Sequence, residues 1–128
     1  MFDVFVETSF SAAHSLVGYE GDCRELHGHN WNVKVTMRCT DTDKIGIAVD
    51  FRKIKKTVRE EAAGLDHKYL NDIDICDEDK SGKFQNPTSE NIARFLFNRL
   101  SERLNNETAK VRSVEVRETG SSGVKYFI

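Results

Sequence analysis

The sequence predicts an α+β fold, in which a four-stranded antiparallel sheet carries two helices on one face in the order β-β-α-α-β-β. Two observations predict it. Segments in which apolar and polar residues alternate lie near both ends of the chain, and two segments with helical periodicity lie between them. Because 128 residues leave room for one hydrophobic core, we expect a single domain over residues 1–128.

The first pair of strands is expected at the N-terminal end. Residues 2–10 are one candidate, in which only Phe5 breaks the alternation. Residues 31–39 alternate without interruption, which is typical of a strand with one buried and one exposed face. A loop over residues 15–25, which contains two glycines, would join these strands.

Two amphipathic helices are expected in the middle of the chain. Asp50 stands where the N-cap residue of the first helix would be, and the second helix begins near Pro87 and Thr88. The apolar stripes of the two helices are Phe51, Ile54, Val58, Ala62 and Leu65, and then Ile92, Phe95, Leu96, Leu100 and Leu104. Each helix has one apolar face, which would pack against the buried face of the sheet.

The last two strands are expected over residues 111–118 and 124–128, around a turn at Gly120–Gly123. With both helices on one face, the other face of this sheet stays uncovered. Association of subunits would then have to cover any apolar part of it.

One long irregular stretch, residues 70–86, contains an acidic run over residues 72–79. Residues 77–82 imitate the first half of a calcium-binding EF-hand loop. However, Thr88 stands at the twelfth position, where that loop needs glutamate, and no helix precedes it. We therefore expect no calcium site there.

The composition excludes several classes of partner. The chain has 19 basic and 21 acidic residues, so its net charge of −2 gives no basic field to hold nucleic acid. No apolar run approaches the roughly 20 residues of a membrane helix, and the first residues lack the pattern of a signal peptide. Three cysteines, an odd number, favour reduced thiols, so we expect a cytoplasmic protein.

Three of the four histidines, His14, His27 and His29, form the candidate metal site. His27 and His29 fall on the face of Trp31 if the second strand extends backward to them. Imidazoles on a buried face are costly unless something binds their nitrogens, and zinc does so. Three histidines with an open position are typical of a catalytic zinc site. The alternative is that the pair is merely hydrogen-bonded or exposed at the start of a strand.

Cys23 lies four residues before His27 and next to Arg24. A thiolate would be favoured beside a dication, which makes Cys23 a candidate nucleophile or general base. An isolated cysteine is otherwise a small buried apolar residue, and this is the interpretation for Cys39. Cys76 lies in the acidic run and has no evident partner.

Two further candidates are acidic. Asp66 precedes His67, and the two could form a proton relay, although adjacent side chains seldom face each other and a pair on the surface is the alternative. Glu118 shares its phase with Val114 and Val116. Its carboxylate could receive the paired N–H groups of an aminopyrimidinone ring, or it could simply reach water at the end of a strand.

Taken together, these residues resemble the 6-pyruvoyl-tetrahydropterin synthase family, in particular its 6-carboxy-tetrahydropterin synthase branch of the queuosine pathway. The resemblance extends from Phe10 to Thr119. The matching motifs are, in order, Phe10-Ser11-Ala12-Ala13-His14, Cys23 through His29, Val49-Asp50-Phe51, Leu65-Asp66-His67, Asn86-Pro87-Thr88-Ser89-Glu90-Asn91 and Val116-Arg117-Glu118-Thr119.

The resemblance implies a tunnelling fold (T-fold), in which three subunits close their sheets into a barrel and two barrels stack into a homohexamer with active sites between subunits. It also implies a role for each candidate. His14, His27 and His29 would hold zinc, Cys23 would transfer a proton, Asp66 and His67 would form its relay, and Glu118 would anchor the pterin ring.

The implied substrate is 7,8-dihydroneopterin triphosphate, and the implied products are 6-carboxy-tetrahydropterin, acetaldehyde and triphosphate. The three residues between Cys23 and His27 favour this branch over the pyruvoyl-forming enzymes, which carry a longer insertion. Glu25 leaves open a folate-type cleavage of the side chain. A non-catalytic scaffold that binds metal or pterin, and a zinc hydrolase, are the alternatives from other classes.

Overall fold

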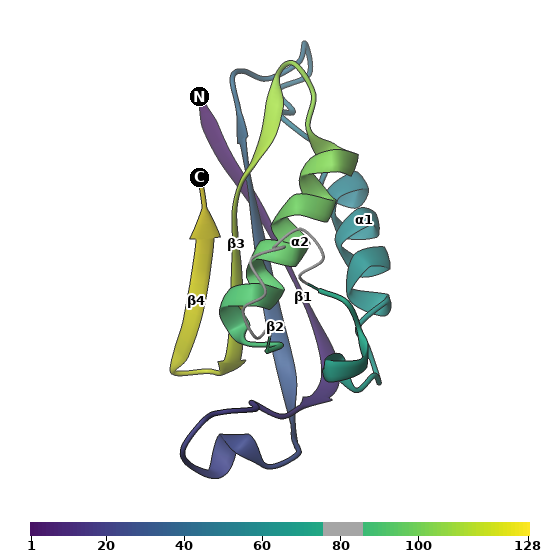
Figure 1. Ribbon diagram of the computed structural model, residues 1–128. Helices are drawn as coiled ribbons and strands as arrows, with labels where there is room; N and C mark the ends of the chain where they lie inside the picture. Colours follow the sequence, from purple (N-terminus) through teal and green to yellow (C-terminus); the bar gives the residue numbers. More distant parts are fainter. Residues whose placement is uncertain (76–85) are drawn as a thin grey trace.

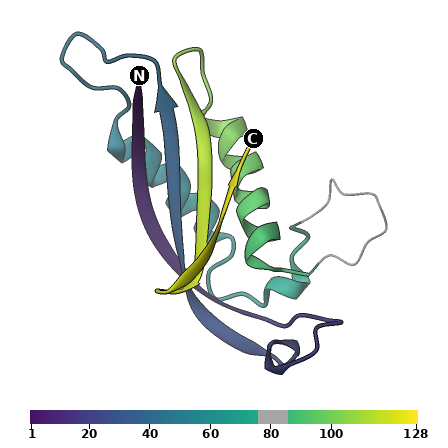
Figure 2. The ribbon, with the colours of Figure 1, turned by 90° about the vertical axis from the view of Figure 1, so that its left-hand side faces the viewer.

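The computed structural model describes residues 1–75 and 86–128, and its element order is the predicted one. The sheet is antiparallel in the order β1-β2-β3-β4. The strands are β1 (Phe2–His14), β2 (His27–Cys39), β3 (Ala109–Thr119) and β4 (Ser122–Phe127), and the helices are α1 (Phe51–Ala63) and α2 (Ser89–Leu104). Figures 1 and 2 show both helices on the same side of the sheet.

The first hairpin is longer than the sequence suggested. β1 continues from Phe10 to His14, and β2 begins at His27, with continuous pairing from Phe2 opposite Cys39 to His14 opposite His27. The residues after Phe10, Ser11 to Ala13, are small and have little strand propensity of their own. Their partners in β2 keep them in the sheet.

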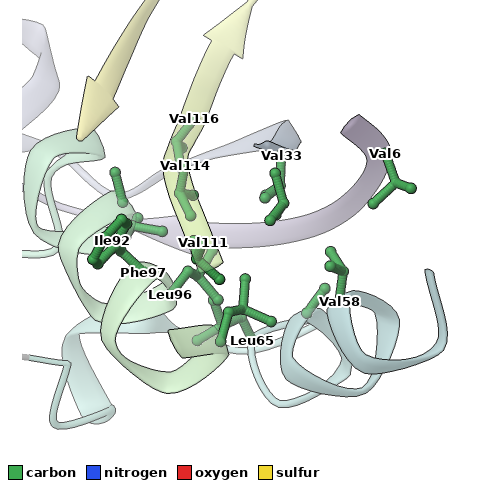
Figure 3. Packing of buried hydrophobic residues seen from close by; sticks show 14 of the residues in the cluster. Val6, Val33, Val58, Leu65, Ile92, Leu96, Phe97, Val111, Val114 and Val116 are labelled. Atoms are coloured by element: carbon green, nitrogen blue, oxygen red, sulfur yellow. The ribbon is translucent and has the colours of Figure 1, made fainter. Parts of the chain in front are cut away.

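The core lies between the sheet and the helices (Figure 3). Along β2 every second residue from Trp31 to Cys39 is buried, and Ile54 and Val58 of α1 reach the same layer. Cys39 is 1% exposed, and burial raises the pKa of its thiol, which fits the interpretation as a small apolar core residue. Phe51 departs from the predicted stripe, since it is 56% exposed at the first position of α1, one turn before the first buried residue.

Both helices begin as predicted, at capping side chains. The Asp50 carboxylate accepts a hydrogen bond from the backbone N–H of Arg52, and the Thr88 hydroxyl accepts one from Asn91. The two helices are also joined by a buried charge, because the Glu61 carboxylate of α1 accepts hydrogen bonds from Arg99 and Arg103 of α2, at 2.6 and 2.9 Å.

The last hairpin turns more tightly than predicted. Strand β3 runs to Thr119 and β4 begins at Ser122, so the turn takes up Gly120 and Ser121 alone. Gly123 therefore lies in β4 rather than in the turn. It is required there because a Cβ atom would lie 2.9 Å from the carbonyl oxygen of Val116.

The other face of the sheet carries exposed charged and aromatic side chains, as expected of an uncovered face. Phe5 and Phe127 are 53% and 58% exposed, and the Lys34 ammonium lies 4.3 Å from the centre of the Phe5 ring. Arg38 forms an ion pair with Asp3 at 2.7 Å on the same face. Among the described residues, no helix is both long and apolar enough to cross a membrane.

Candidate functional site

Three imidazoles converge at one end of the β1–β2 hairpin. Figure 1 shows the loop that joins the two strands at this end. The strand register places His14 opposite His27, and His29 follows two residues later on the same face. Their ligand nitrogens lie within 4.8 Å of one another. This convergence depends on the extension of both strands past the predicted ends.

Hydrogen bonds to backbone carbonyls show that Nδ1 carries a hydrogen in two of the three rings. Nδ1 of His14 lies 2.8 Å from the carbonyl oxygen of Pro87, and Nδ1 of His27 lies 2.7 Å from that of Glu25. A carbonyl oxygen can only accept, so Nδ1 of both rings carries a hydrogen, and the neutral form of each ring then has its lone pair at Nε2. Burial lowers the pKa of His14, which favours this neutral form.

These lone pairs face one another without a partner. The Nε2 atoms of His14 and His27 are 2.9 Å apart, and Nε2 of His29 is buried with no hydrogen bond. Two lone pairs repel at this distance unless a proton or a cation lies between them, and a buried unpaired nitrogen costs free energy. Three imidazoles whose ligand nitrogens converge on one point are a donor set that fits a metal ion.

Trp31 forms the base of the cluster. Its ring meets those of His14 and His29 edge to face, at centroid distances of 4.9 and 5.2 Å, and its Nε1 donates to the carbonyl oxygen of Ala12 at 3.1 Å. Because Trp31 is completely buried, it holds both imidazoles from the core side.

Glu118 reaches the cluster from β3, as its phase with Val114 and Val116 predicts. One carboxylate oxygen lies 3.4 Å from Nε2 of His29, and the other lies 4.0 Å from Nε2 of His14. The hydroxyl of Ser89, at the start of α2, donates to the second oxygen at 3.0 Å. A cavity of about 240 Å³ opens beside the carboxylate, lined in part by Leu16, Thr88 and Ser89.

Ser89 is a site residue that the sequence reasoning missed. It lies in the motif over residues 86–91 that supports the family resemblance, but the resemblance gave it no role, and a serine at the start of a helix is ordinary. Its contact depends on the packing of α2 over β3, which brings the first turn of the helix next to Glu118.

Cys23 lies in the loop between the two histidine-bearing strands, in a short 3₁₀ turn over Asp22–Arg24. It is half-buried and forms no disulfide. Its thiol is not part of the group of metal-ligating atoms that lie within 4.8 Å of one another, which consists of the three imidazole nitrogens. In the same loop, the Glu25 side chain is 78% exposed, so what Glu25 contributes to the cluster is its carbonyl oxygen. Cys76 and the second half of the acidic run, residues 76–79, lie outside the described residues.

Asp66 and His67 do face each other, so the expectation that adjacent side chains seldom meet is wrong for this pair. Nδ1 of His67 lies 2.9 Å from the Asp66 carboxylate. The reason is the backbone of His67, which has a left-handed φ of 56° and turns its ring back toward Asp66. Hydrogen bonds from the Ser11 backbone N–H and from His67 hold the pKa of the Asp66 carboxyl below its ordinary value.

This pair lies along the outer edge of β1. The backbone of Ser11 accepts from the His67 N–H at 2.6 Å and donates to Asp66 at 2.9 Å. The His67 ring is 82% exposed and borders a cavity of about 600 Å³ with Asn30 and Tyr69. Within the described part of the chain, no hydrogen bond joins His67 to Cys23.

Comparisons with known proteins agree on the family to which this chain is similar. The family model described as "6-pyruvoyl tetrahydropterin synthase" matches residues 3–127. The chain is 36% identical to a 6-carboxy-5,6,7,8-tetrahydropterin synthase of Synechocystis sp., over 99% of this chain and 94% of the relative. It is 32% identical to a dihydroneopterin monophosphate aldolase of Pyrococcus furiosus, over 95% and 94% of the two chains. A solved structure of 6-pyruvoyl tetrahydropterin synthase from Caenorhabditis elegans aligns with a TM-score of 0.77 at 29% identity, covering 100% of this chain and 97% of that one.

Proposed function

Since the chain belongs to the 6-pyruvoyl tetrahydropterin synthase family, we propose that it is a zinc-dependent lyase of the 6-carboxy-5,6,7,8-tetrahydropterin synthase type, acting in queuosine biosynthesis. Its substrate is 7,8-dihydroneopterin triphosphate. The observation that carries the proposal is the convergence of three imidazole nitrogens beside the Glu118 carboxylate.

The atom balance of the reaction sets what the site must do. Loss of triphosphate from the side chain leaves two adjacent carbonyl carbons and a methyl group on the reduced pterin. Cleavage of the bond between those carbons with one water then gives the carboxylate and acetaldehyde. Both stages move protons on and off carbon, so the site needs an acid–base group close to the side chain.

His14, His27 and His29 would hold the zinc ion through Nε2. When bound there, zinc would supply Lewis acidity to the hydroxyl groups of the substrate side chain. The carbonyl oxygens of Pro87 and Glu25 keep the first two rings in the tautomer that this requires.

Glu118 would bind the pterin ring. A carboxylate accepts two parallel N–H bonds from an aminopyrimidinone as it does from an arginine fork. Ser89 donates a hydrogen bond that orients that carboxylate, and the cavity beside it is lined in part by Thr88 and Leu16. A ring bound to this carboxylate would lie next to the imidazoles, because one carboxylate oxygen is 3.4 Å from Nε2 of His29.

Cys23 would move the proton, with Asp66 and His67 as its relay. In one chain the relay lies on the exposed outer edge of β1, and both β1 and β4 are edge strands. The edge positions of β1 and β4 and the uncovered sheet face support a homohexamer, a dimer of trimers, in which a neighbouring subunit brings its Asp66–His67 pair to the Cys23 loop. We place this assembly in the cytoplasm, where the thiol stays reduced.

Two related activities are the alternatives. The likeness to the Caenorhabditis elegans enzyme supports a 6-pyruvoyl product, and the relative from Pyrococcus furiosus supports side-chain cleavage of the folate type. The exposed Glu25 side chain, which lies 3.8 Å from Arg24, does not favour the second. A non-catalytic scaffold would have no use for the Asp66–His67 pair or for Cys23.

The test is mass identification of the product formed from 7,8-dihydroneopterin triphosphate. We expect a carboxy-pterin together with acetaldehyde, and a pyruvoyl- or hydroxymethyl-pterin would select one of the alternatives. Cys23→Ala should abolish turnover, whereas Cys39→Ala, which removes a thiol from the core, should keep it. Turnover by Cys23→Ala would instead indicate a zinc hydrolase, and binding of zinc and pterin without turnover would indicate a scaffold.

A further inference from the structure

Two asparagines hold the chain segment that follows His14. The Asn71 amide accepts from the backbone N–H of Ser15 and donates to its carbonyl oxygen, both at 2.9 Å. The Asn86 amide likewise accepts from the backbone N–H of Val17 at 2.9 Å and donates to its carbonyl oxygen at 2.8 Å. Each side chain therefore pairs with both polar groups of one residue, as a neighbouring strand would.

Between these two residues, the segment binds Cys23. The backbone N–H of Leu16 donates to the carbonyl oxygen of Cys23 at 3.0 Å. Ser15, Leu16 and Val17 are consecutive, so the bond to Cys23 lies between the two amide pairs. A shift of either asparagine would move the backbone on which Cys23 is held.

Both asparagines are themselves anchored. The carbonyl oxygen of Asn86 accepts a hydrogen bond from the Asn91 side chain in the first turn of α2, at 2.8 Å. The carbonyl oxygen of the next residue, Pro87, accepts one from Nδ1 of His14. Asn71 lies in the 3₁₀ turn Leu70–Asp72, whose Leu70 is fully buried in the core.

Packing gives the Cys23 loop little support of its own. The turn over Asp22–Arg24 has no buried residue, and three apolar side chains of the loop are more than half exposed: Val17 and Tyr19 at 51% and Leu26 at 67%. A segment with few buried contacts takes its position from its hydrogen bonds. In this loop the bonds that tie it to the rest of the fold include both asparagine pairs.

We propose that Asn71 and Asn86 are positioning residues, an asparagine clamp that sets where Cys23 lies relative to the three imidazoles. The inference rests on the proposed function insofar as Cys23 transfers the proton. Because a misplacement of about 1 Å at a reacting group can cost on the order of 100-fold in rate, loss of the clamp should lower kcat. It should leave KM nearly unchanged, because Glu118 binds the pterin.

The experiment compares Asn71→Leu and Asn86→Leu with the wild-type protein, as purified with its metal. Three quantities are measured: kcat and KM on 7,8-dihydroneopterin triphosphate, the rate at which iodoacetamide alkylates the Cys23 peptide, and the zinc content. We expect kcat to fall by about 10- to 100-fold with KM within about threefold. Alkylation of Cys23 should be at least about threefold faster as the loop opens, with zinc retained.

Asn106→Leu is the matched control. The Asn106 side chain also accepts from backbone N–H groups, those of Thr108 and Ala109 at 2.9 Å, but at the end of β3 opposite to Glu118. This variant should lose a similar amount of thermal stability without a change in kcat or in Cys23 alkylation. If the leucine variants of the clamp do not fold, Asn71→Asp and Asn86→Asp keep the shape and the acceptor oxygen and allow the same comparison.

The proposal is overturned if the clamp variants keep the wild-type kcat and alkylation rate, or if Asn106→Leu changes both as much as they do. A wild-type protein that does not turn over the pterin would refute the proposed function alone. The alkylation rate of Cys23, and hydrogen exchange at the Leu16 amide, would still decide whether the clamp holds the loop.

Discussion

The Glu118 carboxylate lies 3.4 Å from Nε2 of His29, yet it stands outside the group of nitrogens that converge on one point. One of its oxygens is already occupied by the Ser89 hydroxyl. The imidazoles and the carboxylate would therefore have different roles: the imidazoles would hold the metal, and the carboxylate would bind the pterin ring of the substrate. Substitution of Glu118 should therefore affect substrate binding and not metal content.

Glu118→Gln tests this division. The amide replaces one acceptor oxygen by a donor, which opposes the N–H groups of the pterin, so we expect KM to rise by at least about 10-fold. The zinc content should stay at the wild-type level. Loss of zinc together with activity would show that Glu118 is a ligand.

Ser89→Ala should have a smaller effect of the same kind. It removes one hydrogen bond from the carboxylate, worth about 1 kcal/mol, or about fivefold in KM. Ser101→Ala, in the same helix, is the control, because the Ser101 hydroxyl is buried without a hydrogen-bond partner in the described residues. Its removal should leave KM unchanged, and equal effects of the two variants would argue against the Ser89 contact.

Zinc content should distinguish the proposed metal ligands from the fourth histidine, His67. We expect His14→Ala and His27→Ala to reduce bound zinc from about one ion per chain to a small fraction of that, because each removes one of three ligands. His67→Ala should keep the zinc, since its ring is 82% exposed at the edge of β1. Elemental analysis of the purified variants measures this, and zinc retained by His27→Ala would contradict the proposed ligand set.

Asp66→Asn tests the relay. The amide oxygen can still accept from the Ser11 N–H, but the pairing with His67 loses its negative charge. We expect kcat to fall by about 10- to 100-fold with little change in KM or zinc content. Asp74→Asn, which changes an exposed acidic residue after the 3₁₀ turn Leu70–Asp72, should behave as wild type.

The pH dependence of stability should report on Glu61. Burial raises the pKa of this carboxyl, but hydrogen bonds from Arg99 and Arg103 outweigh it and the pKa is lowered overall. A lowered pKa in the folded state means that the stabilisation is present above the ordinary value of about 4.3 and is lost as the pH falls through the folded pKa.

Glu61→Gln should thus destabilise the protein by about 1–3 kcal/mol at pH 7, with a difference from wild type that shrinks toward pH 3. Urea unfolding of both proteins across this range measures it. A difference that does not vary with pH would show that the charge of Glu61 contributes nothing.

Much of the fold follows from local pattern, whereas the site depends on contacts between distant elements. The alternation from Trp31 to Cys39 and the caps at Asp50 and Thr88 are short-range signals, and the structure confirms them. The pairing of Asp66 with His67 could not be predicted in this way, because a left-handed backbone at a non-glycine residue leaves no mark in the sequence.

The position of Ser89 beside Glu118 also needed the tertiary fold, as did the extension of β1 to His14. In each case a partner far along the chain decides the outcome. Composition and periodicity describe what a segment prefers by itself, and they carry no information about such a partner.

The register that sets His14 opposite His27 makes them the final rung of the β1–β2 ladder. An ion bound by both would cross-link the two strands at the loop end of the hairpin and prevent these strand ends from fraying. Demetallation should then expose the connecting loop to proteases while the far end of the hairpin, where Phe2 pairs with Cys39, stays intact. The metal would in this way protect the chain as well as serve its chemistry.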